Sequence, residues 1–360
     1  MDSGTVRAYK AVENLYHRYL TGIILRTVMT RGAADATELV FRLFRRQQQA
    51  TLLPGLKKLG LDGLPDAVAC AQYHYLSNYL GDVGVQYGYE SDRKAWVRYP
   101  PPRWIWDGTA ICGIPTTVSQ AMMRGWHSHN GVTLGNPRLG FVCTMQTTDG
   151  QPGLEGYFYE YDHDLAPEER LRFAPEEESP EFDLGAMPTL DDTDWPEDRV
   201  RKALRNYAMQ YVRNLLPEMV TLFGPEAAAD LGRTTGRLIG MQYYAETAAL
   251  LDIQDRDVAG FGAYMVALGH GHGDAMRADV SGDEVVVRQH SWRLMRDTDP
   301  ISPSVFDALN GLWEGALSVH DRFLSSEVTK RLDRGNECFE WHIRRRPSRR
   351  DDPAVRPSSV

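Results

Sequence analysis

Cysteine is scarce in this sequence, and the common signatures of catalysis are missing from it. The 360 residues include four cysteines, which are widely spaced and form no Cys-x-x-Cys pair. This pattern argues against a disulfide framework and against a zinc ribbon. The chain also lacks a Gly-x-Ser-x-Gly elbow, a phosphate-binding loop and a dinucleotide fingerprint. The enzyme classes that such motifs define are therefore set aside.

Long apolar runs and a basic leader are absent as well. Residues 1–10 lack a basic segment followed by an apolar one, so no signal peptide is predicted. The most apolar early stretch, residues 21–28, is far shorter than the ~20 residues that span a bilayer. We therefore expect a cytoplasmic protein with no membrane partner.

Basic residues are outnumbered by acidic ones. Lys and Arg total 40, Asp and Glu total 49, and the formal net charge is −9. Because phosphate contacts need clustered basic residues, no nucleic-acid partner is expected. A basic cluster near the C-terminus lies among Pro, Ser and Asp, and we predict a disordered tail over residues 346–360. The sequence is also compatible with a homo-oligomer.

Hydrophobic periodicity predicts an α+β fold. Helical spacing of apolar residues alternates with short β-hairpins bounded by turn residues. Residues 163–198 are rich in Asp, Glu and Pro, which is typical of a linker or of a connection that runs over the surface. We therefore predict an N-terminal α+β module over residues 1–162, the linker, and a C-terminal α+β module over residues 199–345. The expected helices are 5–30, 35–49, 65–79, 116–126, 200–223, 227–251 and about 309–323, and the expected hairpins are 83–99, 140–161 and 275–290.

An internal repeat supports two similar modules. With a shift of about 190 residues, 56–99 lies over 246–289 without a gap, and roughly eight of forty-four positions are identical. Chance alignment of two amphipathic halves is the alternative. The order of elements also matches, and the closing strands Gly156–Tyr159 and Cys338–Trp341 are expected to correspond. We predict two tandem modules, each a helical block with a small antiparallel sheet, related by a pseudo-two-fold axis.

One candidate for acid–base chemistry lies in the second half. Glu314, Ser318 and Asp321 have spacings of four and three residues, which place them on one face of a helix. His290 ends the preceding strand, so an imidazole and a carboxylate are expected to converge. His290 would act as the base, with Glu314 as its orienter or as the acid. A solvated helix face beside a surface histidine is the alternative.

Two further histidine clusters are candidates for ligand binding. His270 and His272 lie in a Gly/His run, and on an extended strand both imidazoles would face one side as a metal or ligand edge. A plain helix-to-strand turn is the alternative. In the first half, His127 and His129 follow Trp126, whose indole would form the wall of a pocket or part of the core. The first half is also rich in aromatic residues, which suits a flat or cyclic ligand.

The second half resembles a known family. The segments Val287–Trp292 and Arg331–Phe339, with the helix between them, resemble the L-2-amino-thiazoline-4-carboxylic acid hydrolase family. They are also similar to the small-molecule-binding domains of vinyl-reductase-type proteins. The resemblance covers about residues 200–345. His290 stands where many of those relatives have a cysteine, which leaves the metal unknown, although His and carboxylate ligands would suit zinc or another divalent metal.

The resemblance implies a hydrolase for a non-peptide C–N bond of a small cyclic compound. In that case His290 would activate water, and Glu314, His320 or Asp321 would assist it or hold a metal. Arg288 would bind a substrate carboxylate. The other substrate-binding candidates are Trp292, Trp313, His270, His272, His127, His129 and Trp126. A lyase or isomerase using the same pocket, and a non-catalytic sensor or carrier of a small molecule, are the alternatives.

Overall fold

The chain divides into two compact units. The computed structural model describes residues 1–102, 108–298 and 300–346. Unit 1 comprises Met1–Leu15 and the chain from Pro225 onward, and unit 2 comprises Tyr16–Gly224. Helix α1 (Ser3–Arg31) therefore begins in unit 1 and continues into unit 2. This division differs from the predicted module boundaries, because residues 1–15 group with the C-terminal half and helix α6 groups with the N-terminal half.

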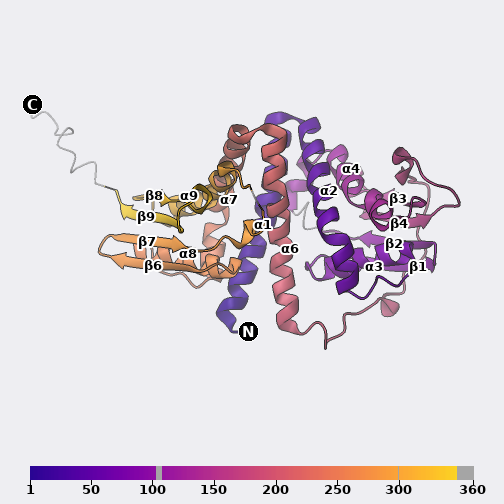
Figure 1. The fold of residues 1–360 in the computed structure, drawn as a ribbon, viewed down its shortest axis with the longest axis horizontal. Coiled ribbons are helices and arrows are strands. Elements are labelled where there is room, and N and C mark those ends of the chain that lie inside the picture. The colour runs from indigo at the N-terminus through magenta and orange to yellow at the C-terminus, as the bar shows by residue number, and fades with distance from the viewer. Residues whose placement is uncertain (103–107, 299, 347–360) are drawn as a thin grey trace, which may run out of the picture. The chain divides into compact units, whose positions relative to one another are not determined.

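Unit 2 combines helices with a five-stranded sheet. Its helices after α1 are α2 (Ala33–Lys58), α3 (Asp66–Tyr79), α4 (Thr116–Gly125), α5 (Asn130–Leu134) and α6 (Glu197–Phe223). Its strands are β1 (Gln86–Ser91), β2 (Lys94–Tyr99), β3 (Leu139–Met145), β4 (Leu154–Glu160) and β5 (Leu171–Phe173). The strand order is β1-β2-β4-β3-β5, with β5 parallel to β3 and the other pairs antiparallel. Helix α3 packs against β1, β2 and β4 (Figure 1).

The acidic segment 163–198 is part of unit 2, and this corrects its prediction as a linker. It supplies strand β5, which pairs with β3. Ala174 and Phe182 from this segment join Trp96, Val142 and Tyr157 in a buried cluster. The segment therefore contributes apolar side chains to the core, although its average composition is acidic and rich in proline.

Unit 1 contains a four-stranded antiparallel sheet. Its helices after the first residues of α1 are α7 (Pro225–Leu250), α8 (Val258–His272) and α9 (Pro303–His320). Its strands are β6 (Met276–Ser281), β7 (Glu284–Gln289), β8 (Leu324–Lys330) and β9 (Phe339–Arg345), in the order β6-β7-β9-β8. Helix α8 packs against β6 and β7, which Figure 1 shows as orange arrows. The α+β class predicted from periodicity is confirmed.

The two sheets share a strand order over four strands. The order β1-β2-β4-β3 in unit 2 matches β6-β7-β9-β8 in unit 1. The shift in residue number that places the first residue of β1 on the first residue of β6 also places both ends of β2 on the ends of β7. Val97 pairs with Gly156, and Val287 pairs with Trp341. The counterpart of Gly156 is therefore Trp341 rather than Cys338, so the predicted match of the closing strands is shifted by three residues.

Helices α7 and α9 cross with their backbones in contact. A Cβ atom added to Gly315 would lie 2.1 Å from the carbonyl oxygen of Arg237, and one added to Gly311 would lie 2.2 Å from that of Arg233. On α7, a Cβ atom at Gly240 would lie 2.3 Å from a backbone oxygen of α9. Any larger residue at these positions would push the helices apart, so glycine fixes the spacing of this pair.

The first turns of α1 pack within unit 1. A Cβ atom added to Gly271 on α8 would lie 2.6 Å from the backbone oxygen of Ala8. Ala8 and Val12 are both buried. Within the described residues, no helix has the length and apolar character required to cross a membrane. Except for Arg346, the predicted tail lies outside the described residues.

Candidate functional site

Glu314, a predicted catalytic residue, is held in ion pairs. Its carboxylate lies 2.8 Å from Nη2 of Arg233 and 3.5 Å from Nη1 of Arg237, both on α7. The Nδ2 atom of Asn310 donates a hydrogen bond of 3.0 Å to the same carboxylate. Together with Ser318, Glu314 lines a polar cavity of about 480 Å³ in unit 1. These contacts tie α9 to α7 and occupy the carboxylate.

His320 is a buried histidine whose two ring nitrogens have partners. Its Nδ1 atom lies 2.5 Å from the hydroxyl of Tyr244, and its Nε2 atom lies 2.7 Å from the carbonyl oxygen of Asp257. Burial lowers the pKa of His320, because desolvation disfavours the charged imidazolium. The imidazole thus joins the end of α9 to the start of α8.

Asp321 and His290 are the other two predicted catalytic residues, and each lies in a different environment. Asp321 follows the last residue of α9, accepts a hydrogen bond of 2.8 Å from the backbone of Phe323, and pairs with Arg345 at 3.1 Å. His290 is exposed and follows the end of β7. No two of the four predicted catalytic residues share a hydrogen bond or ion pair. Across residues 1–102, 108–298 and 300–346, no group of three or more His, Cys, Asp or Glu side chains could hold a metal ion.

The prediction that His270 and His272 lie on an extended strand is wrong. Both belong to the last turn of helix α8, and Gly273, with a φ of 82°, follows the helix as its C-cap. Strand β6 begins later, at Met276. Residues two apart on a helix point in different directions, and accordingly His270 is exposed whereas His272 is buried.

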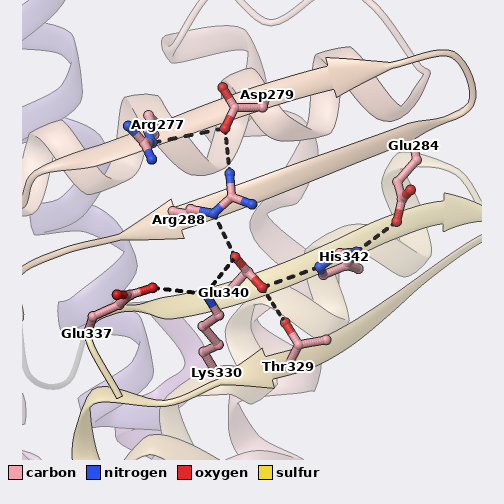
Figure 2. Close-up of polar contacts among 9 residues, drawn as sticks. All are labelled: Arg277, Asp279, Glu284, Arg288, Thr329, Lys330, Glu337, Glu340 and His342. Atoms are coloured by element: carbon pink, nitrogen blue, oxygen red, sulfur yellow. Dashed lines mark hydrogen bonds and ion pairs between the residues drawn. The ribbon is translucent and has the colours of Figure 1, made fainter. Parts of the chain in front are cut away.

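Arg288 belongs to a polar network on the sheet of unit 1 (Figure 2). Its Nε atom lies 2.6 Å from Glu340, and its Nη1 atom lies 2.5 Å from Asp279. Glu340 also accepts hydrogen bonds of 2.8 Å from Thr329 and 3.4 Å from His342. Burial alone would raise the pKa of Glu340, but the hydrogen bonds from Thr329, Arg288 and His342 outweigh it and lower this pKa to about 2. The predicted substrate-binding arginine is thus engaged by carboxylates of the protein.

The two predicted tryptophans of unit 1 make ring contacts. Trp292 meets Phe339 edge to face at 5.0 Å, and Trp313 meets Tyr264 in the same way at 6.2 Å. Both contacts lie in the range typical of aromatic packing. Neither indole is among the described residues that line the polar cavity beside Glu314.

Unit 2 contains an aromatic cavity of about 340 Å³. Its aromatic and imidazole wall consists of Phe44, Tyr73, His74, Tyr99, Trp126, His127, Trp195, Tyr207 and Tyr211. Its neutral polar lining consists of Gln47, Thr51, Ser77, Asn78, Asn206 and Gln210. Among the described lining residues, Lys58 is the only Lys, Arg, Asp or Glu. The structure therefore brings Trp126 and His127 of the predicted site into one cavity, whereas His129 does not line it.

His74 and His127 stack in the wall of this cavity. Their ring centroids are 4.1 Å apart and their planes differ by 14°. The Nδ1 atom of His74 lies 3.0 Å from the hydroxyl of Tyr99, and its Nε2 atom lies 3.4 Å from Nδ2 of Asn130. Because the Asn130 amide donates to Nε2, the His74 proton is placed on Nδ1. Burial lowers the pKa of His74 to about 3, so the ring is neutral near pH 7.

Hydrogen bonds connect the cavity walls on α6 and α3. The hydroxyl of Tyr211 donates to that of Tyr207 at 3.0 Å, and Tyr207 donates to Oδ1 of Asn78 at 2.8 Å. The Nδ2 atom of Asn78 then donates to the carbonyl oxygen of His74 at 2.6 Å. These three bonds fix the tyrosine side chains, so part of the cavity is formed in advance of any binding.

The cavity wall also contains a buried acceptor and a buried donor that lack partners. Gln47 is 2% exposed and Trp126 is 8% exposed. Within the described part of the chain, neither Oε1 of Gln47 nor Nε1 of Trp126 makes a hydrogen bond. A buried polar atom without a hydrogen bond lowers the free energy of unfolding by about 1–3 kcal/mol. Such atoms in a folded protein call for an explanation, and a bound molecule is one.

Gln47, Lys58 and Tyr207 were missed by sequence reasoning. They lie on α2 and α6, which are far apart in the sequence, and none of them follows a recognisable spacing. The signal that did point here was the concentration of aromatic residues in the first half, together with Trp126 and His127. No protein-family model, curated protein or solved structure matches the chain.

Proposed function

We propose that unit 2 binds a small planar organic molecule in its aromatic cavity, and that the protein serves as a sensor or carrier. The observation that carries this proposal is an aromatic wall around about 340 Å³ that contains unpartnered Gln47 Oε1 and Trp126 Nε1. Ligand sites are typically mostly apolar hollows of roughly 300–1,000 Å³ with few polar groups.

Binding is favoured over catalysis by the surroundings of the candidate residues. Glu314 and His320 are engaged by side chains and backbone of unit 1. The described lining of the aromatic cavity includes no carboxylate, and its His74 is neutral near pH 7. Hydrolysis of a C–N bond, and the lyase or isomerase alternative, therefore remain hypotheses without a supporting contact.

Thermal unfolding of the full chain with planar aromatic probes tests the proposal. A ligand present at 100 times its Kd should raise the free energy of unfolding by about 2.7 kcal/mol. Ala203 lines the cavity, so Ala203→Trp should fill it and abolish the stabilisation. Ala34→Trp places the same side chain at an exposed position of α2 and should leave binding intact. Equal binding by wild type and Ala203→Trp would contradict the proposal.

We also infer that the two units descend from one duplicated module. Beyond the shared strand order, the pair Arg288–Glu340 has a counterpart in unit 2. The Nε atom of Arg98 lies 2.5 Å from Glu155. Thr144 then donates to Glu155 at 3.0 Å, as Thr329 does to Glu340.

The turn before the last strand supports the same inference. The backbone of Gln146 donates to the side chain of Gln151 at 2.6 Å, and the backbone of Arg331 donates to the side chain of Asn336 at 2.9 Å. Both turns contain a glycine with positive φ, Gly150 at 83° and Gly335 at 84°. Chance similarity would not be expected to repeat both a cross-strand triad and a turn. The pseudo-two-fold relation, the cytoplasmic location and a homo-oligomeric state remain predictions.

A further inference from the structure

We infer that the ligand of unit 2 is a planar organic acid whose carboxylate binds Lys58, an inference that rests on the proposed function. Lys58 is the last residue of α2 and lines the cavity. Its Nζ atom lies 4.9 Å from the ring centroid of Trp195, which is buried and also lines the cavity. The ammonium group is therefore placed where an aromatic ring and a carboxylate of one molecule could both be bound.

A second cation lies on the same indole. The guanidinium carbon of Arg199 is 4.1 Å from the Trp195 centroid. Among the described residues, neither Lys58 nor Arg199 forms an ion pair with a carboxylate. Lys58 is exposed as a whole residue, but partial desolvation of its ammonium group, and then the Arg199 cation, lower its pKa, since both disfavour the charged form. An anion beside Lys58 would relieve this local excess of positive charge.

The other lining residues of the cavity indicate the shape and charge of the rest of the ligand. Tyr73 and Trp126 stack with planes 20° apart, and they offer flat apolar surfaces. Lys58 is the one Lys or Arg among the described lining residues, and a carboxylate is an anion that its ammonium group binds by charge-assisted hydrogen bonds. A carboxylate on an aromatic ring fits both features, with a ring substituent available to Gln47.

Matched acid and amide probes test this inference by calorimetry with the full chain. We would titrate 4-hydroxybenzoate against 4-hydroxybenzamide, and indole-3-carboxylate against indole-3-carboxamide, at pH 7. The acids should bind about 10- to 100-fold more tightly than their amides, because a hydrogen bond to a charged group contributes that much. Lys58→Met should remove the difference, and Lys58→Arg should keep it.

Lys57→Met is the matched control, since Lys57 and Lys58 are both exposed but Lys57 is not among the described lining residues. This variant should preserve the preference for acids. If acids and amides bind equally well, or if Lys58→Met keeps the preference, the organic-acid inference fails while binding in the cavity stands. If neither series binds wild type, both the inference and the proposed function fail.

Discussion

Arg288 and Glu340 face each other across β7 and β9, with the guanidinium Nε 2.6 Å from the carboxylate. In unit 2, Arg98 and Glu155 are paired in the same way across β2 and β4. Opposite charges directly across antiparallel strands stabilise a sheet. Both carboxylates are buried, at 2% for Glu155 and 5% for Glu340, so each needs its arginine.

Replacing Glu340 tests the importance of this pair. Glu340→Gln should lower the free energy of unfolding of unit 1 by about 1–3 kcal/mol at pH 7. The pKa of Glu340 is lowered from 4.5 to about 2, so its contribution is present above pH 4.5 and is lost as pH falls towards 2. Urea unfolding followed by circular dichroism should show the difference between wild type and variant shrinking over that range. Glu327→Gln, at an exposed edge position, is the control and should change little.

His74 should make unit 2 sensitive to acid. Its pKa is about 3 in the folded chain and near 6.5 when unfolded, so the unfolded state takes up a proton first. The free energy of unfolding should therefore fall as pH drops from 6.5 to 3, by roughly 2–5 kcal/mol. His74→Gln should flatten this slope, as measured by urea unfolding at several pH values. His163→Gln replaces an exposed histidine and is the control. If the pH slope is unchanged in His74→Gln but lost in His163→Gln, His74 is not the group that makes unit 2 sensitive to acid.

Periodicity was sufficient to predict the α+β class and the three hairpins at 83–99, 140–161 and 275–290, because helices and strands place apolar residues at different intervals. It was insufficient for the segment 163–198, where Ala174 and Phe182 reach the core from an acidic stretch. The second helix was likewise expected to end at residue 49, yet α2 continues through Pro54 to Lys58. In both cases tertiary packing overrides a local signal.

The site was harder to predict than the fold. Glu314 was expected to serve catalysis because its spacing places it on a polar helix face, but that face meets Arg233 on a helix distant in sequence. The Gly/His run around His270 was expected to be extended, and it proved to be the end of a helix. Trp126 and His127 were identified by their residue types, whereas Gln47 has no feature in the sequence that marks it.

The glycine contact between α7 and α9 should be intolerant of any side chain. Gly311→Ala would place a methyl carbon 2.2 Å from a backbone oxygen, which forces the helices to move. We expect a loss of about 1–3 kcal/mol in the free energy of unfolding, measured in urea. Gly4→Ala, where the added carbon meets only the end of the Asp2 side chain, should be neutral or slightly stabilising. Equal effects of the two substitutions would rule out close packing as the cause.

Thiol reactivity should be confined to one cysteine. Cys112 is exposed, whereas Cys70, Cys143 and Cys338 are buried, and all four are free. Ellman's reagent should therefore label the native chain once and the denatured chain four times. Cys112→Ser should abolish the native reaction, and Cys143→Ser should leave it unchanged. Rapid labelling of a second thiol in the native chain would show that unit 1 or unit 2 opens easily.

Helix α1 imposes an order of events on biosynthesis. Ala8 and Val12 leave the ribosome long before Gly271, the residue on α8 that packs against Ala8. Domains generally fold as units during translation, so residues 1–15 must wait, with their apolar side chains uncovered, until the last third of the polypeptide has emerged. A nascent chain of this protein should consequently depend on chaperones at its beginning rather than at its end.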